Sequence, residues 1–367
     1  MAKVLMACVG GFLGAGKTTA LVGAARELMG RGLRVGIITN DQGNNLVDTE
    51  VVRGLGFPAE EIAGGCFCCR FDEFVVHAER ICEQHDPQVI FAEAVGSCTD
   101  LAATVYAPLR RFYAGRFDLA PLSIAVEPDR LKRFFQQAES GFPDSVGYLF
   151  EKQLAEADLI LLNKGELIDP LESDGILQSI EERVGRIPVH LMSAREGWGI
   201  VEWVDRLLAG HASGQRILEI DYETYGKAEA CLAWLNATVD AAYPAPFHPR
   251  DVGECLIANI QQRCSNAQAA IAHLKILIAT ANGSARIAVT EDRSAPQWSG
   301  EVEFALVEEA SVVINARVSS SAELLREIVE AALTRTGNDT GVRFTVQDLQ
   351  AFLPSAPKPR YRMQAQD

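Results

Sequence analysis

Residues 9–21 read Val-Gly-Gly-Phe-Leu-Gly-Ala-Gly-Lys-Thr-Thr-Ala-Leu. The segment from Gly11 to Thr18 satisfies the pattern Gly-x4-Gly-Lys-Ser/Thr, in which a glycine-rich loop joins a strand to a helix. The context agrees with the pattern, because an apolar run precedes it and a helix-forming run follows it. The loop N–H groups and the helix N-terminus then surround a phosphate. The stretch therefore predicts a phosphate-binding loop at the end of a buried strand.

The side chains of this loop have distinct expected roles. Lys17 is placed to reach the β- and γ-phosphates of a nucleoside triphosphate, and the Thr18 hydroxyl is placed to bind Mg²⁺. The alternative, an ordinary glycine-rich turn, is disfavoured by the strand–loop–helix order. The residues expected at the nucleotide are Gly11, Gly14, Ala15, Gly16, Lys17, Thr18 and Thr19.

Short apolar runs alternate with amphipathic stretches over the first two hundred residues. The expected strands are Val4–Val9, Arg34–Thr39, Gln88–Phe91, Pro121–Val126, Leu159–Leu162 and Pro188–Met192. The expected helices include Thr18–Met29, Asp72–Glu83, Pro128–Ala138 and Ile200–Leu208. Strands that alternate with helices predict an α/β fold, here a P-loop domain whose mainly parallel sheet carries helices on both faces.

A carboxylate stands at the end of one of these strands. Glu93 follows the apolar run Val89–Ala92, and Gly96 comes three residues later. Ligands bind at the carboxyl ends of parallel strands, so that Glu93 is expected at the mouth of the sheet. It is the candidate catalytic acid near the metal or the attacking water, together with Lys17. The alternative is a surface glutamate at a strand end.

The choice of base is indicated by residues 163–166, Asn-Lys-Gly-Glu, directly after the strand Asp158–Leu162. They resemble the Asn-Lys-x-Asp guanine box, in which a carboxylate accepts two hydrogens of guanine that adenine does not offer. Here the acid is Glu166, one methylene longer. Ser193 and Ala194, in Met-Ser-Ala-Arg, fit the later loop that supports the base. Asn163, Lys164, Glu166, Ser193 and Ala194 are therefore candidate nucleotide contacts.

Three of the nine cysteines, Cys66, Cys68 and Cys69, occupy four positions. In an extended segment Cys66 and Cys68 point to one side and Cys69 to the other. All three reach one ion only if the chain turns near Cys69, and Gly64-Gly65 makes such a turn easier. Three thiolates suit a soft or borderline ion such as Zn²⁺. Water, a carboxylate or a group on a recipient protein remains open as the fourth ligand. Redox chemistry and inert packing are the alternatives.

After residue 211 the sequence pattern changes. The expected elements are a strand over 231–243, a turn over Pro244–Asp251, a helix over 252–271, two strands joined at Asn282-Gly283, a strand over 311–318 and a helix over 321–335. These predict a smaller C-terminal α+β domain over residues 222–340, after a P-loop GTPase domain over 1–212. A Pro-rich tail, residues 341–367, is expected to be ordered only by docking.

Composition limits the partners. The net charge of −15 repels nucleic acid and anionic lipid, so that neither is expected to bind. No apolar run is long enough to span a bilayer. The run Val4–Leu13 is interpreted as a buried strand and not as the core of a signal peptide, because Lys17 and Thr18 follow it. The expected location is cytoplasmic.

Taken in order, these motifs resemble the CobW-type metallochaperone GTPases, relatives of HypB, UreG and MeaB. The similarity covers about residues 3–210 and extends weakly to Pro246–Asp251, after which the family's usual Arg-Ala-Lys-Gly run is missing. The motifs that carry it are GGFLGAGKTT (10–19), TNDQG (39–43), GGCFCCR (64–70), AEAVG (92–96) and QLAEADLILLNK (153–164).

The resemblance implies a GTPase, slow without a partner, that binds GTP or GDP, Mg²⁺ and a transition metal such as Zn²⁺ or Co²⁺. In the family the Cys-x-Cys-Cys cysteines bind metal between the switch regions, which maps that role onto Cys66, Cys68 and Cys69. Asp41 becomes a candidate metal or Mg²⁺-shell carboxylate on the first switch, and Glu93 matches the acid of the second. A client metalloenzyme or corrinoid protein is the implied partner, and an oligomer is possible.

The cysteines lie between the first switch, from Asn40 onward, and Glu93. The hypothesis is that nucleotide and metal contact the same segments, so that hydrolysis changes the geometry of the thiols. Two other functions stay open. One is a P-loop ATPase or kinase with a redox cysteine cluster. The other is a GTPase chaperone of a corrinoid- or metal-dependent client that binds little metal itself.

Overall fold

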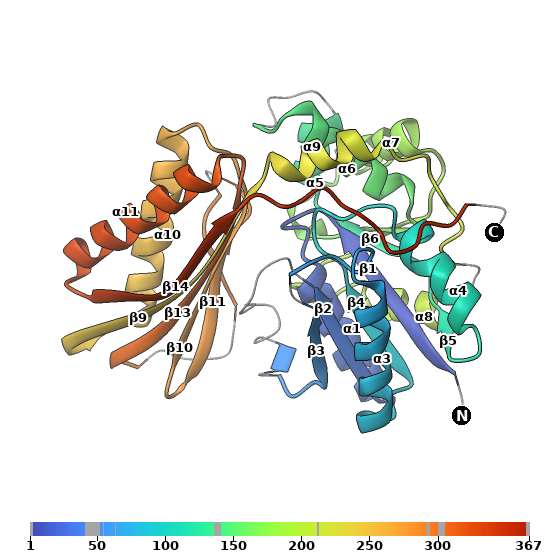
Figure 1. Ribbon diagram of the computed structural model, residues 1–367, viewed down its shortest axis with the longest axis horizontal. Helices are drawn as coiled ribbons and strands as arrows, with labels where there is room; N and C mark the ends of the chain where they lie inside the picture. The colour runs from blue at the N-terminus through green and yellow to red at the C-terminus, as the bar shows by residue number, and fades with distance from the viewer. Residues whose placement is uncertain are drawn as a thin grey trace.

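The computed structural model describes residues 3–40, 52–53, 55–62, 64–135, 141–210, 213–291, 294–299 and 305–364. These residues form two bodies that lie side by side, each built on its own sheet (Figure 1). The candidate site lies where the two bodies meet.

The first body contains an eight-stranded sheet in the order β3-β2-β4-β1-β6-β7-β8, with β5 also paired to β1. All of its strand pairs are parallel. The strands are β1 (Val4–Gly11), β2 (Val35–Asn40), β3 (Ala59–Ile62), β4 (Val89–Glu93), β5 (Phe117–Leu119), β6 (Ser123–Val126), β7 (Leu159–Leu162) and β8 (Val189–Leu191). The mainly parallel sheet predicted from the alternating pattern is confirmed.

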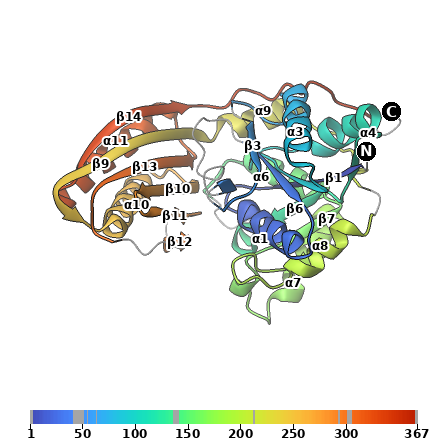
Figure 2. The ribbon, with the colours of Figure 1, turned by 90° about the horizontal axis from the view of Figure 1, so that it is seen from below.

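Helices cover both faces of this sheet (Figure 2). Their bounds are α1 (Lys17–Gly30), α3 (Phe71–His85), α4 (Ala107–Tyr113), α5 (Pro128–Phe135), α6 (Asp144–Ala155), α7 (Ser173–Val184), α8 (Ile200–Leu208) and α9 (Tyr222–Ala230), with a π-helical turn η1 (Ala102–Tyr106) and a 3-10 turn η2 (Gly165–Leu167). The α1 and α8 helices share one apolar cluster, and α3, α4, α6, α7 and α9 share the other. No helix in the described part of the chain combines the length and apolar character needed to cross a membrane.

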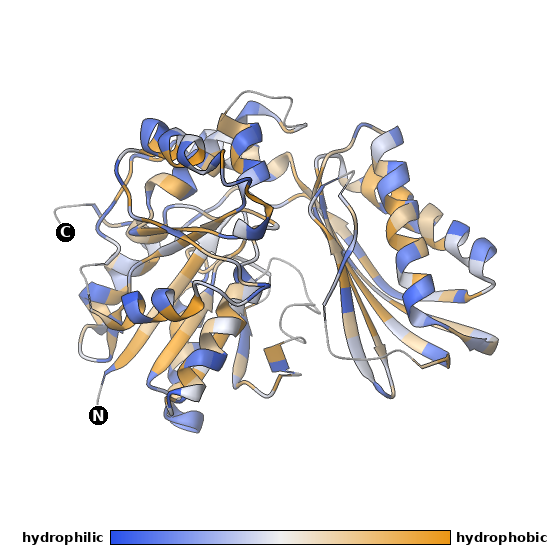
Figure 3. Cartoon of the chain, turned by 180° about the vertical axis from the view of Figure 1, so that it is seen from behind, coloured by the Kyte–Doolittle hydropathy of each residue, from blue (hydrophilic) through white to orange (hydrophobic). Residues whose placement is uncertain are grey.

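The central strands are apolar throughout, because both of their faces are covered. Figure 3 colours them as hydrophobic, and β4 and β7 are buried at every position. This burial stabilises the sheet by about 25 cal/mol for each Å² of apolar surface removed from water. It also brings the carboxyl ends of β1, β2 and β4, which carry the phosphate loop, Asn40 and Glu93, to the same edge of the sheet.

The second body contains a six-stranded antiparallel sheet in the order β12-β11-β10-β13-β9-β14. Its elements are β9 (Ala233–Phe247), α10 (Pro249–Asn266), β10 (Ile271–Thr280), β11 (Gly283–Val289), β12 (Gln297–Ser299), β13 (Val307–Val318), α11 (Ala322–Thr340) and β14 (Arg343–Phe352). Both helices pack on one face of the sheet, on the side away from the first body (Figure 1). The smaller α+β unit predicted for this region is confirmed.

Two boundaries expected here are wrong. The segment expected as a turn, Pro244–Asp251, instead contains the end of β9 as far as Phe247 and, from Pro249, the start of α10. β9 continues beyond Ala242, where its pairing with β14 ends. A strand edge without a partner tolerates proline, which has no N–H to donate. The helix expected as far as Ile271 ends at Asn266, since Gln268 has a left-handed backbone (φ 54°) and Ile271 opens β10.

The end of the chain differs from the expected tail. Residues 343–352 form β14, which extends the second sheet beyond residue 340. At the other boundary, Tyr225 and Ala228 of α9 belong to the apolar core of the first body. The segment after β14 then crosses from the second body over the first and ends near α4 (Figure 1). The division into domains at residues 212, 222 and 340 stays a prediction.

Candidate functional site

The phosphate loop joins β1 to α1, and its glycines have backbone angles that other residues rarely adopt. Gly14 and Gly16 have φ values of 83° and 84°, and Gly16 caps α1. A side chain at Gly16 would also collide with the Asn163 amide. Lys17 is buried, and its Nζ donates hydrogen bonds to Gly11 O at 2.8 Å and Phe12 O at 3.3 Å, within the curve of the loop.

A threonine and a glutamate meet beside this loop. Thr18 Oγ1 donates a hydrogen bond to Glu93 Oε1 at 2.9 Å, and both residues are buried. Glu93 ends β4, next to β1, so that the sheet register fixes the pair. A hydroxyl and a carboxylate are ligands that Mg²⁺ prefers. The donor set therefore fits the cation that accompanies a nucleoside triphosphate.

The expected base-binding residues also come together. Asn163 Nδ2 donates to Ala15 O at 2.8 Å, and Asn163 Oδ1 accepts from Ala194 N at 2.9 Å. Asn163 thus joins the phosphate loop to the later loop. Lys164 has a left-handed backbone (φ 58°), and Glu166 is exposed at the rim of a cavity of about 130 Å³ that Asn163 and Ala194 also line. Ser193 is buried behind this cavity, and its Oγ accepts from Glu196 N at 3.1 Å.

The three clustered cysteines converge. Cys66 Sγ lies 2.9 Å from Cys68 Sγ and 3.3 Å from Cys69 Sγ, and the Cys68 and Cys69 sulfurs are 3.8 Å apart. A turn brings them together, in which Cys69 N and Arg70 N both donate to Cys66 O at 3.0 Å just before α3 begins. Cys66 and Cys68 are buried and Cys69 is half-buried. The sulfurs therefore converge on one point that a single metal ion can occupy.

The thiols of this cluster do not ionise alike. Hydrogen bonds from Cys68 and Cys69 lower the pKa of Cys66, although its burial opposes this shift. Interaction with Cys66 raises the pKa of Cys68 and raises that of Cys69 to about 11. Cys66 is thus the thiol of the three that loses its proton most readily. A divalent cation favours loss of the remaining protons, because metal ions bind thiolates and not thiols.

A fourth cysteine, which the sequence analysis left unassigned, lies next to the cluster. Cys98 is buried, and its thiol contributes to the pKa shifts of Cys66 and Cys68. It follows Glu93 by five residues, on the segment that leaves β4. The Gln153 side chain supports that segment by donating from Nε2 to Gly96 O at 3.0 Å and to Cys98 O at 2.8 Å.

One side chain connects the phosphate loop to the cysteines. Asn40 ends β2 and lines the same cavity as Lys17. Its Nδ2 donates to Ile62 O at 2.9 Å and to Gly65 O at 2.6 Å, while its Oδ1 accepts from Phe67 N at 3.0 Å. Asn40 therefore fixes the backbone on both sides of Cys66 from a position at the nucleotide site.

The C-terminal segment covers the cysteine turn from outside. Lys358 N donates to Cys69 Sγ at 3.2 Å, and Arg360 N donates to Cys68 O at 2.7 Å. Further along, Arg362 Nε donates to Asp100 Oδ2 at 2.7 Å, and the Tyr361 ring packs 5.5 Å from that of Phe71. The docking expected of the tail is thus present, and its position is beside the thiols.

Asp41, the candidate carboxylate of the first switch, lies outside the described residues. His77, the histidine closest to the cysteines in sequence, binds Glu60 instead, with Nδ1 2.6 Å from Oε2. It is not part of the group of potential metal ligands found among the described residues.

A buried carboxyl group supports the segment that leaves β4. Glu156 accepts hydrogen bonds from Thr99 Oγ1 at 2.9 Å and from Ala102 N at 3.2 Å. Burial, with a smaller contribution from the charge of Asp100, raises the pKa of Glu156 from 4.5 to about 8. The folded chain therefore keeps this carboxyl protonated at pH values where the unfolded chain ionises it.

This shift predicts a pH-dependent stability. Because the folded pKa is the higher one, the contribution of Glu156 is complete below about pH 4.5 and is lost as the pH rises through about 8. The loss approaches 1.4 kcal/mol per pH unit in that window. We expect Glu156→Gln to flatten the decline, since an amide stays neutral and the Thr99 hydroxyl can reverse its hydrogen bond. Urea unfolding at pH 5, 6.5 and 8 measures this, with surface Glu83→Gln as control. Equal slopes in wild type and Glu156→Gln would contradict the assignment.

The second body forms one wall of the site, and no sequence motif predicts this contact. Arg286 and Gln297 line both the phosphate cavity and the base cavity. The strands β11 and β12 carry polar residues at alternate positions. This pattern indicates that the sheet has a polar face, but it does not indicate which part of the protein that face contacts.

Comparison with known proteins identifies relatives of about half of this chain. The model of the family described as "CobW/HypB/UreG, nucleotide-binding domain" matches residues 5–190. The zinc chaperone CobW of a Sinorhizobium species is 30% identical over 225 residues, which are 53% of this chain and 60% of that protein. The zinc chaperone CobW of Pseudomonas aeruginosa is 29% identical over 228 residues, 54% and 58% of the two chains. The chain thus spans about 60% of the length of these curated relatives.

Among solved structures, HypB from Helicobacter pylori in complex with nickel has a TM-score of 0.39 at 15% identity, over 56% of this chain and 86% of that one. Zn(II)-bound YjiA GTPase from E. coli has a TM-score of 0.36 at 13% identity, over 92% and 99% of the two chains.

Proposed function

The chain belongs to the CobW/HypB/UreG family, as its motifs indicated, and from this premise we propose that it is a GTP-hydrolysing metallochaperone. It binds GTP at the loop that contains Lys17 and holds Zn²⁺, or a similar ion such as Co²⁺, between Cys66, Cys68 and Cys69. The state of the nucleotide changes the affinity for the metal. The zinc chaperone activity named for the two CobW relatives supports this choice.

The observation that carries the proposal is the double role of Asn40. Its side chain makes three hydrogen bonds to the backbone around the first cysteine, while the residue itself lines the phosphate cavity. A nucleotide that moves the end of β2 therefore moves the turn that positions the thiols. This contact is a direct path for coupling, and no intermediate element is needed.

The chemistry at the phosphate end follows from three side chains. Lys17 binds the β- and γ-phosphates, and Thr18 with Glu93 would hold Mg²⁺, which neutralises charge on those phosphates when bound. Glu93 also orients the attacking water from the end of β4. Asn163 and Glu166 select guanine, and Ala194 N–H supports the Asn163 amide.

Hydrolysis alone does not release the metal. Coupling between two sites is typically ~1–3 kcal/mol, whereas thiolate-rich zinc sites bind their ion by ~10–16 kcal/mol. The switch therefore changes the affinity by a modest factor and leaves the ion bound. Transfer requires exchange of ligands with a client protein, and the half-buried Cys69 is the thiol most open to such exchange.

Coupling is tested by measuring Zn²⁺ affinity with GDP and with a non-hydrolysable GTP analogue. We expect the two affinities to differ by about 5- to 150-fold in the wild type. Asn40→Ala is expected to bring the ratio close to one, because the link between cavity and turn is gone. Asn338→Ala, on the exposed side of α11, is the control and is expected to keep the wild-type ratio.

Identical Zn²⁺ affinities in the two nucleotide states of the wild type would contradict the proposed coupling. Competition between GTP and ATP for the same site provides the second readout. Preference for ATP would favour the ATPase or kinase with a redox cysteine cluster over the metallochaperone.

A further inference from the structure

The sheet of the second body has two unlike faces. On the face covered by α10 and α11, the strands contribute apolar side chains such as Leu235, Ile276 and Ile314. The intervening positions point to the other face, which is polar. Its side chains include Trp234, Asn236, His273, Lys275, Arg286, Asn315 and Arg317.

This polar face looks onto the phosphate loop and not onto solvent. A cavity of about 140 Å³ separates the two. Lys17, Thr18 and Glu93 line it from the first body, and His273, Lys275 and Arg286 line it from the second. Arg286 also lines the neighbouring cavity that contains Glu166. The second sheet is therefore the opposite wall of the nucleotide site.

The charge around this cavity is opposite in sign to that of the protein. The chain has a net charge of −15, yet the described residues around the cavity include five lysine or arginine side chains and one carboxylate, Glu93. A low-dielectric cavity with this excess concentrates a multiply charged anion.

Buried N–H groups point to the same kind of ligand. Trp234 Nε1 and His273 Nε2 have no hydrogen-bond partner among the described residues, although both side chains are at least nine-tenths buried. Such a group left without a partner costs about 1–3 kcal/mol. Burial and the neighbouring Lys275, Arg317 and Lys17 lower the pKa of His273, so that its ring is neutral. An anion oxygen would accept from Trp234 Nε1, and from His273 Nε2 in the tautomer that carries its proton there.

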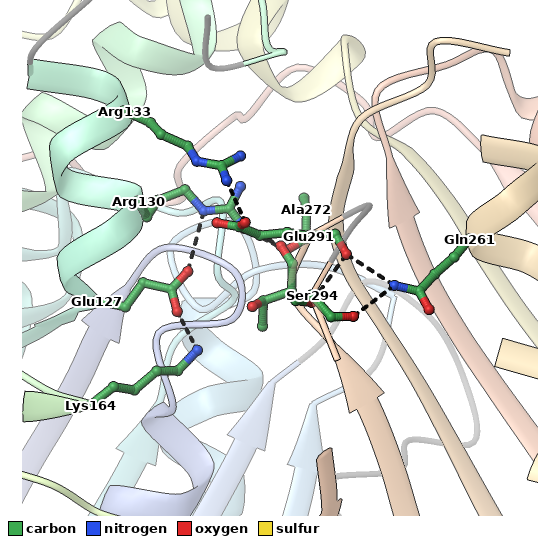
Figure 4. Close-up of polar contacts among 9 residues, drawn as sticks. Glu127, Arg130, Arg133, Lys164, Gln261, Ala272, Glu291 and Ser294 are labelled. Atoms are coloured by element: carbon green, nitrogen blue, oxygen red, sulfur yellow. Dashed lines mark hydrogen bonds and ion pairs between the residues drawn. The ribbon is translucent and has the colours of Figure 1, made fainter. Parts of the chain in front are cut away.

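The wall is held in place by contacts between the bodies. Arg130 of α5 is buried and donates from Nη2 to Ala272 O at 3.1 Å and to Thr290 O at 2.5 Å (Figure 4). Ala272 lies at the start of β10, the strand that carries Lys275, and Thr290 follows β11, the strand that carries Arg286. Arg133 binds Glu291 Oε2 at 2.5 Å in the same view.

The same network reaches the guanine box. Glu127 accepts from Lys164 and lies 3.5 Å from Arg130 Nε (Figure 4). The loop that follows β7 and the second sheet thus share one buried carboxylate. At the phosphate loop itself, a side chain added at Gly14 would meet Thr290 Cγ2, so that the loop backbone touches the end of β11.

We propose that Lys275 and Arg286 bind the phosphate chain of the nucleotide from the side opposite Lys17, so that the second sheet completes the site. This inference rests on the proposed function. Lys275 lines the cavity of Lys17 and Glu93 and is not among the residues that line the base cavity, so that we assign it to the terminal phosphate. Arg286 lines both cavities and contacts the phosphates nearer the ribose. Arg317 positions this wall, since its guanidinium stacks 3.8 Å over the Trp234 ring and donates to Leu235 O at 3.1 Å.

Calorimetric titration of the full chain with GDP and with the imido analogue of GTP, both with Mg²⁺, tests this assignment. We expect Lys275→Ala to weaken the analogue about tenfold or more, since a hydrogen bond between charged groups is lost, and to change GDP affinity less than threefold. Arg286→Ala is expected to weaken both. Lys275→Arg should restore most of the loss. Arg343→Ala, exposed on β14, and Lys227→Ala, exposed on α9, are the matched controls. Thermal melting of each variant without nucleotide establishes that it folds.

Each result has a defined meaning. If both alanine variants bind GDP and the analogue within twofold of the wild type, the assignment is wrong. Equal loss of both nucleotides in Lys275→Ala would contradict contact with the terminal phosphate. Inorganic phosphate is then titrated into the GDP complex of each variant. If Lys275→Ala loses phosphate binding but keeps its affinity for the GTP analogue, Lys275 contacts the released phosphate product and not the terminal phosphate of GTP, which contradicts the assignment. The proposed function fails separately if the wild type binds no guanine nucleotide or if Lys17→Ala binds as tightly as the wild type.

Discussion

Replacement of Cys66, Cys68 and Cys69 by serine is expected to weaken Zn²⁺ binding at least about a thousandfold and to leave guanine-nucleotide binding within about threefold of the wild type. The three sulfurs lie within 4.8 Å of one another, and they are the thiolate ligands of the proposed site. Serine hydroxyls do not ionise near neutral pH and are poor Zn²⁺ ligands. Since each tenfold change is 1.4 kcal/mol, a thousandfold loss is about a quarter to two fifths of the energy of a thiolate-rich site.

Competition against a fluorescent zinc chelator measures this loss, and titration with GDP in the absence of Zn²⁺ measures the nucleotide site without the coupling between the two ligands. The matched control is a second triple variant, Cys82→Ser, Cys231→Ser and Cys255→Ser, which removes as many thiols away from the cluster. A Cys98→Ser variant tests whether this neighbouring thiol supports the site, and it is expected to weaken Zn²⁺ binding by about tenfold. Zn²⁺ affinity unchanged in the cluster variant would contradict the proposed metal site. Loss of both metal and nucleotide would indicate that the cluster only supports the fold.

The fold of the first body was predictable because its signals are local. The phosphate loop needs a strand, three glycines and a helix within about twenty residues, and the parallel strands need only short runs of valine, isoleucine and leucine. Cys66, Cys68 and Cys69 were found for the same reason, since four consecutive positions must turn to bring three thiols together.

The remainder of the site depends on contacts between distant parts of the chain. The Asn40 amide binds around Cys66 only because β2 and β3 are neighbours in the sheet. Cys98 reaches the cluster from the end of β4, and Lys358 reaches it from the C-terminal segment. Neither has a spacing pattern that points to the first three cysteines.

The contact between the second sheet and the nucleotide site was also not predictable from local sequence patterns. Lys275 and Arg286 belong to strands whose alternation indicates one polar face, and an antiparallel sheet normally turns such a face to water. In this protein the polar face is turned toward the phosphate loop instead, because Arg130 binds the start of β10 and the residue after β11. Arg130 looks in the sequence like an ordinary surface residue of the amphipathic helix at Pro128.

Glu93→Gln is expected to lower the rate of GTP hydrolysis by about 10²- to 10⁴-fold, the range typical for loss of a group that moves or orients a proton. Binding of GTP should change little. The glutamine oxygen can still accept the hydrogen bond that Thr18 Oγ1 donates at 2.9 Å, and the side chain keeps its size within a buried site. What is lost is the negative charge that holds Mg²⁺ and orients the attacking water.

Single-turnover hydrolysis, with protein in excess over GTP, measures this step without interference from product release. Glu202→Gln, at the exposed start of α8, is the control and is expected to hydrolyse GTP at the wild-type rate. Raising the Mg²⁺ concentration separates the two roles of the carboxylate. If added Mg²⁺ restores the rate of Glu93→Gln, the residue acts mainly as part of the cation site, and if the rate stays low at saturating Mg²⁺, it acts on the water. If Glu93→Gln hydrolyses GTP as fast as the wild type at every Mg²⁺ concentration, Glu93 is not a catalytic residue. Both of its proposed roles, binding of Mg²⁺ and orientation of the water, would then be contradicted.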